Sequence, residues 1–122
     1  MSPLTKAEFE ARIQAARPDL ADEFLEPDVF GGETVFFIHG ETIMAVALRS
    51  SQKLLWVMGV LGGGLEWLRE LKKFGLSNGY EWLGFKVKRG LPWGKAIARY
   101  GKARLMAETP SGDEYCASLN AR

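Results

Sequence analysis

The chain has 122 residues, of which 47% are hydrophobic and 25% are charged, and its formal net charge is +1. This composition is typical of a water-soluble globular protein, and the length predicts one domain spanning residues 1–122. The charged stretch 1–16 does not resemble a secretory signal, and no apolar run reaches the roughly 20 residues that a membrane helix needs. We therefore expect a cytoplasmic protein that does not enter a membrane.

The cysteine and histidine counts limit the chemistry. Cys116 is the only cysteine, so an internal disulfide is excluded, and it is expected to be a small core residue. His39 is the only histidine, which argues against a zinc site because such sites need several nitrogen or sulfur ligands. We expect no metal.

The N-terminal part predicts two helices. Thr5 and Glu8 have the spacing of a capping box, which predicts a helix over residues 5–16. Pro18 suits the first position of a second helix, because its missing N–H would be unpaired there anyway. Pro27 ends that helix.

Strands follow. Residues 33–39 and 42–48 are rich in β-formers around a short turn, which predicts a β-hairpin. Residues 53–58 form an uninterrupted apolar strand, which favours burial on both faces of a sheet. Residues 59–64 then form a glycine-rich turn.

The rest of the chain alternates helices and strands. The helix after the glycines is expected to bury Leu65, Leu68, Leu71 and Leu76, and to leave Trp67 partly exposed. A strand over 80–87, a helix over 93–100 and strands over 102–108 and 114–119 complete the order α-α-β-β-β-α-β-α-β-β. The order predicts an α/β (α+β) domain with a central mixed sheet of about six strands flanked by helices, in which 53–87 is a crossover between parallel strands.

This order resembles the fold of the GCN5-related N-acetyltransferases (GNAT), with the first strand missing or unrecognised. The resemblance covers residues 33–119. Gly62 and Gly64 match the glycines of the family's cofactor loop, but Gly59 stands where the family has Arg or Gln. The run 96–100, Ala-Ile-Ala-Arg-Tyr, looks like a later family motif, although Trp93 replaces its Asn and Arg104-Leu105 its Gly-Phe.

The resemblance implies that the chain binds acetyl-CoA. The pyrophosphate would be held by backbone groups of the turn, where glycines permit close approach and the helix N-terminus favours an anion. In the family the preceding strand pairs with the pantetheine arm. The residues so implied are Leu61, Gly62, Gly63, Gly64 and Leu65 in the turn, and Trp56, Val57 and Met58 in the strand.

The resemblance also implies a catalytic residue. Tyr100 matches the tyrosine that protonates the leaving thiolate in many members of the family. No carboxylate lies in strand 53–58, so the general base is unassigned, and His39, Glu41 and Glu81 are candidates only by elimination.

Charge is unevenly distributed. Residues 1–41 hold nine acidic and three basic side chains, whereas residues 42–122 hold six acidic and thirteen basic ones. The segment from Lys86 to Arg104 contains only basic charges, so it could bind an acidic or phosphate-bearing partner, or simply be a solvated face. Self-association is a further expectation.

Two alternatives to an enzyme stay open. One is a non-enzymatic protein with this fold, encoded by a phage and serving as a virion component or in host interaction. The other is a nucleic-acid-binding module that uses the basic segment.

Overall fold

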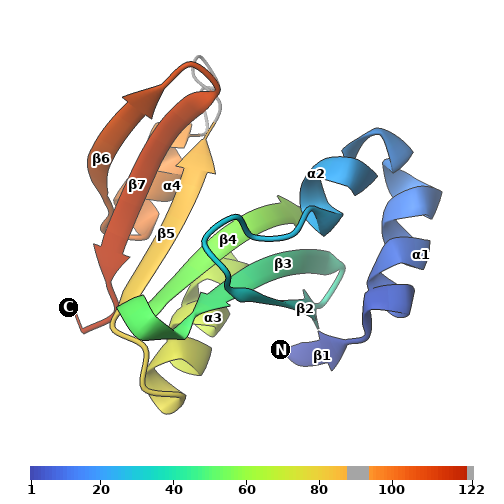
Figure 1. Cartoon of the computed structure of the whole chain (residues 1–122), viewed down its shortest axis with the longest axis horizontal. Helices are drawn as coiled ribbons and strands as arrows, with labels where there is room; N and C mark the ends of the chain where they lie inside the picture. Colours follow the sequence, from blue (N-terminus) through green and yellow to red (C-terminus); the bar gives the residue numbers. More distant parts are fainter. Residues whose placement is uncertain (88–93, 121–122) are drawn as a thin grey trace.

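The computed structural model describes residues 1–87 and 94–120. Its centre is a seven-stranded sheet in the order β1-β2-β3-β4-β5-β7-β6 (Figure 1). Neighbouring strands are antiparallel except β4 and β5, which are parallel, so the predicted mixed sheet and crossover are confirmed. The strands are β1 Ser2–Leu4, β2 Glu33–His39, β3 Thr42–Arg49, β4 Leu54–Leu61, β5 Trp82–Val87, β6 Arg104–Thr109 and β7 Gly112–Ser118.

In the described ranges four α-helices flank the sheet: α1 Lys6–Ala16, α2 Ala21–Leu25, α3 Glu66–Ser77 and α4 Gly94–Tyr100. Short 3-10 turns precede α2 at Pro18–Leu20 and β4 at Ser50–Gln52. Residues 88–93, including Lys88, Arg89 and Trp93 of the sequence analysis, lie outside the described residues. Within the described parts of the chain, no helix is long and apolar enough to span a membrane.

The chain supplies its own first strand. β1 pairs antiparallel with β2, with Ser2 opposite Ile38 and Leu4 opposite Phe36. Of the two alternatives, a missing first strand or one that the sequence pattern does not reveal, the structure therefore supports the second. It is three residues long and contains Pro3, so it shows no period-two pattern of the kind that identifies a strand.

The predicted capping box at the start of α1 is confirmed. The backbone N–H of Thr5 donates to Oε1 of Glu8 at 2.9 Å, and the N–H of Glu8 donates to the Thr5 hydroxyl at 3.1 Å. These two bonds satisfy donors that a helix start otherwise leaves unpaired.

Two apolar clusters occupy opposite faces of the sheet. On one face α1 and α2 bury Phe9, Ile13 and Phe24 against strand residues that include Phe36 and Ala45. On the other face α3 and α4 bury Leu68, Leu71 and Ile97 against residues that include Phe37, Met44, Leu55 and Phe85. β4 contributes to both clusters, which agrees with the predicted burial of its two faces.

Two expectations about α3 are wrong. Trp67 is 5% exposed rather than partly exposed, because the flank of the helix that carries it also faces the sheet. Leu76 is 48% exposed rather than buried, because it lies in the last turn of α3 on the side away from the sheet. Both expectations assumed that only the leucines of α3 face the sheet, whereas the buried side consists of Trp67, Leu68, Leu71 and Gly75.

Candidate functional site

The pairing of β4 with β5 stops halfway along β4. The register runs from Leu54 opposite Trp82 to Val57 opposite Phe85. Beyond it the two strands diverge (Figure 1), while β4 stays paired with β3 as far as Leu61. Within the described residues, the backbone of Met58–Leu61 therefore has no strand partner on the side of β5.

A β-bulge accompanies this divergence. Ala45 of β3 lies opposite Gly59, but the next residue, Val46, lies opposite Val57, so Met58 is the extra residue of β4. A bulge bends its strand and increases the local twist. The bend begins where β4 leaves β5.

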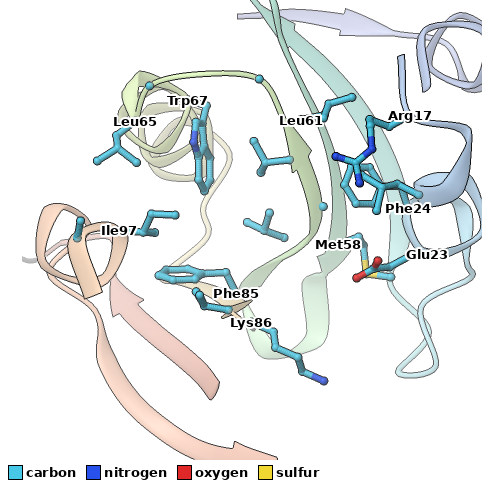
Figure 2. Close-up of a pocket in the computed structure, with 18 residues that line it drawn as sticks. Arg17, Glu23, Phe24, Met58, Leu61, Leu65, Trp67, Phe85, Lys86 and Ile97 are labelled. Carbon is cyan, nitrogen blue, oxygen red and sulfur yellow. The ribbon is translucent and has the colours of Figure 1, made fainter. Parts of the chain in front are cut away.

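A cleft of about 820 Å³ lies between the separated strands. Leu61, Leu65 and Trp67 form one side, and Phe85 and Ile97 lie across from them (Figure 2). α2 and the turn before it close another side with Arg17, Leu20, Glu23 and Phe24. The volume and the mainly apolar lining are typical of a small-molecule site.

The glycine-rich turn borders this cleft between β4 and α3. Gly62 and Gly64 have positive φ angles of 141° and 76°, which glycine adopts at low cost. A β-carbon on Gly62 would also lie 2.6 Å from Oγ1 of Thr42. The buried Thr42 hydroxyl donates to the carbonyl of Gly63 at 3.2 Å, so β3 anchors the turn.

Within the described residues, the backbone N–H groups at the start of α3 have no side-chain acceptor. No side chain caps its N-terminus at Leu65. The first N–H groups of a helix have no partner within the helix, and together with the helix dipole they favour an anion. Gly63 adds no obstruction, since a β-carbon there would meet nothing within 4 Å.

Gly59 is part of β4 and not of the turn, because β4 continues three residues beyond the predicted end at Met58. A β-carbon on Gly59 would lie 2.4 Å from the ring of Phe24. The space in which a side chain at position 59 would begin is thus filled by Phe24 of α2, so a larger residue there requires a rearrangement.

We expect Gly59→Ala to destabilise the fold by about 1–3 kcal/mol, because the buried ring of Phe24 must move to admit a methyl group. The measurement is the free energy of urea unfolding. Gly63→Ala is the matched control, since its β-carbon points into open space. Equal stability losses for the two variants would refute the packing role of Gly59.

The structure brings most of the predicted cofactor residues together. Val57, Met58, Leu61, Gly62, Gly64 and Leu65 line the cleft. Trp56 does not: its ring lies where a β-carbon of Gly84 would be, and it faces the guanidinium of Arg49 at 4.9 Å. Gly63 does not line the cleft either. Its carbonyl accepts the hydrogen bond from Thr42 that holds the turn against β3.

Tyr100 lies at the end of α4 and is 40% exposed. It is not among the residues that line the cleft, whereas Ala96 and Ile97, about one turn earlier, are. Its role as a proton donor stays a prediction.

None of the base candidates named by elimination lines the cleft. His39 lies 3.5 Å from Glu66, Glu81 lies 3.6 Å from Lys53, and Glu41 is exposed in the β2–β3 turn. Glu23 of α2 is the one carboxylate in the lining of the cleft as described, and it lies beside Met58 (Figure 2). No sequence pattern points to Glu23, because nothing local shows that α2 reaches the gap between β4 and β5.

The basic segment is divided in space. Lys86 belongs to β5, where its Nζ lies 3.7 Å from Glu114 and donates to Ser111 at 3.0 Å. Arg99 and Lys102 lie at the far end of α4 instead.

Cys116 is half-buried rather than a core residue, and burial raises the pKa of its thiol. Among the described residues no group of three or more His, Cys, Asp or Glu side chains could hold a metal ion.

No family model matches the chain. No curated protein sequence matches it either.

Solved structures do match its fold. An acetyltransferase from Bacillus subtilis in complex with CoA has a TM-score of 0.61 and 12% identity, covering 98% of this chain and 95% of that one. A GNAT-family acetyltransferase from Staphylococcus aureus has a TM-score of 0.60 and 12% identity, covering 97% of each chain. The chain therefore has the fold of the GNAT-family acetyltransferases.

Proposed function

We propose that the protein is an acyl-CoA-dependent N-acyltransferase. The observation that carries this proposal is the cleft between β4 and β5, which runs from the backbone edge of Met58–Leu61 that β5 does not pair with to the uncapped start of α3. An apolar cleft that ends at free N–H donors suits a ligand with a long uncharged arm and an anionic end. The similar fold of an acetyltransferase that binds CoA supports the choice of ligand.

The residues present fit such a ligand. The backbone N–H groups of Gly64, Leu65 and the first turn of α3 would hold the pyrophosphate, and the free edge of β4 would hydrogen-bond the pantetheine arm. Bound acyl-CoA would supply a thioester, which is an activated acyl group. The apolar walls, Trp67, Phe85 and Ile97 among them, would keep water away from it.

Acyl transfer forms a bond between the acceptor nitrogen and the acyl carbon and breaks the bond from that carbon to sulfur. The nitrogen loses a proton, and Glu23 is the carboxylate of the described cleft that could receive it. The leaving thiolate gains a proton, for which Tyr100 is the predicted donor.

The first test is calorimetric titration of the protein with acetyl-CoA and with CoA at moderate salt. We expect saturable binding that Gly63→Asp weakens at least about tenfold, because a carboxylate beside the start of α3 repels the pyrophosphate. Gly63→Asn is the matched control, since it adds a side chain of the same shape without charge. Absence of binding at millimolar ligand, or equal weakening by both variants, would contradict the proposal.

A second candidate is a non-enzymatic protein that has this fold but does not transfer acyl groups. The position of Tyr100, exposed and outside the lining of the cleft, favours it. Release of free thiol from acetyl-CoA in the presence of an amine panel separates the two, because only the transferase produces it. Binding without thiol release would favour the second candidate.

A further inference from the structure

The two helical layers of the protein carry opposite charges. Residues 6–26, which include α1 and α2, hold six acidic and three basic side chains. α3 and residues 96–102, which include most of α4, together hold five basic and two acidic ones. Because the layers cover opposite faces of the sheet (Figure 1), the molecule has an acidic face formed by residues 6–26 and a basic face formed by α3 and residues 96–102.

Much of this charge has no ion-pair partner in the part of the chain that the structure describes. Asp22 and Glu26 on the acidic face are exposed and form no ion pair among the described residues. The same holds on the basic face for Arg69, Arg99 and Lys102. Each face therefore offers charge that a partner of opposite sign could pair.

A hydrogen bond joins the two helices of the basic face. Lys72 of α3 donates from Nζ to the carbonyl of Gly101 at 2.7 Å, which joins α3 to the end of α4. Burial lowers the pKa of Lys72, and the nearby charge of Lys102 lowers it further. The fold thus keeps like charges close together, an arrangement that a bound anionic surface would relieve.

Exposed apolar side chains accompany both faces. On the acidic side the loop after α2 exposes Val29 by 83% and Phe30 by 68%. The ring of Phe30 lies 4.4 Å from the guanidinium of Arg49, which fixes its position. On the basic face Leu76 is 48% exposed and Tyr100 is 40% exposed. Each face combines unbalanced charge with exposed apolar surface, as the patches of protein interfaces do.

We propose that the protein associates with itself head to tail, the acidic face of one copy docking on the basic face of the next. A symmetric contact of either face with itself would oppose like charges, whereas a heterologous contact pairs opposite ones. The near-zero net charge also favours a second copy over nucleic acid, because a polyanion attracted by one face is repelled by the other. This inference is independent of acyl transfer.

Sedimentation of the whole chain at low and high salt tests the proposal. We expect a weight-average mass above the 13.6 kDa of one chain in about 30 mM salt, and a return toward that mass in about 500 mM salt, where exposed charges are screened. Each face is then neutralised separately, as Asp22→Asn with Glu26→Gln, and as Arg99→Gln with Lys102→Gln. Each double variant should weaken association about tenfold.

Mixing the two double variants gives the sharpest result. Each retains one intact face, so the equimolar mixture should form a heterodimer that grows no further. Glu41→Gln with Lys53→Gln, which removes charges outside both faces, is the matched control and should associate like the parent chain.

Three outcomes would overturn the proposal. One is a 13.6 kDa monomer in low salt at every concentration tested. Another is a dimer that neither double variant weakens, which would place the interface elsewhere. The third is binding of a fluorescent oligonucleotide that depends on Arg99 and Lys102, with no self-association, which would make the basic face a nucleic-acid surface.

Discussion

Replacing Asp28 with alanine is expected to destabilise the protein by about 3–5 kcal/mol, the range for removing one partner of a buried ion pair. The Asp28 side chain is 1% exposed and that of Arg49 is 11% exposed. Arg49 donates two hydrogen bonds to the carboxylate, at 3.0 and 2.8 Å. Without Asp28 the guanidinium stays buried between the rings of Phe30 and Trp56 with no countercharge.

The loss extends to the backbone. The N–H of Gly32 donates to Asp28 at 2.9 Å and that of Phe30 at 3.3 Å, so the carboxylate also organises the loop that enters β2. Urea unfolding followed by tryptophan fluorescence measures the effect. Glu81→Ala is the control, since its pair with Lys53 is half exposed and is worth at most about 1 kcal/mol. Similar losses in the two variants would contradict the assignment.

The same ion pair predicts a dependence of stability on pH. Hydrogen bonds from Arg49 lower the pKa of Asp28 below its usual value. The carboxylate therefore stabilises the folded state fully above the unfolded aspartate pKa of roughly 3.9, and this contribution is lost as the pH falls below it, through the lower folded pKa. Asp28→Asn should flatten the stability curve in that range, measured from pH 5 to pH 2. An unchanged slope would show that Asp28 does not titrate as described.

Local signals in the sequence were enough for most of the fold. The capping box of Thr5 and Glu8 and the β-rich segments around Gly40 act through neighbouring residues, so the sequence alone identifies them. β1 is different, because three residues that contain Pro3 become a strand only by pairing with β2, about 30 positions later. Trp67 is a different case, because it lies four residues before Leu71 on the buried side of α3, and a stripe that counts only leucines leaves it out.

The candidate site was predictable where it rests on backbone conformation. Gly62 and Gly64 adopt positive φ angles, and glycines in a sequence indicate such positions because glycine adopts them at low cost. The place of Glu23 in the cleft and the close approach of Phe24 to Gly59 depend on how α2 packs on β4. The spacing of residues in the sequence does not predict that packing. The bulge at Met58 was also hidden, because it is defined by the register with β3.

Leu68→Ala is expected to cost about 2.7–5 kcal/mol of folding free energy, the range for a leucine removed from a core that cannot collapse around the space. Leu68 is fully buried in the cluster between α3, α4 and the sheet. It lies so close to Gly101 that a β-carbon there would be 2.8 Å from its Cδ2. The contact joins α3 to the end of α4, the helix that supplies Ile97 to the cleft.

Because Leu68 joins α3 to α4, its truncation should lower the global stability and also increase local opening of α4. Urea unfolding gives the global loss, and amide hydrogen exchange should show added local opening at Ile97, since α4 loses its support from α3. Leu76→Ala on the same helix is the matched control: its side chain is 48% exposed, so its truncation should change stability by no more than about 0.5 kcal/mol. If Leu68→Ala lowered stability while exchange at Ile97 rose no faster than in β3, the contact would be a general core contact and not the support of the α4 wall.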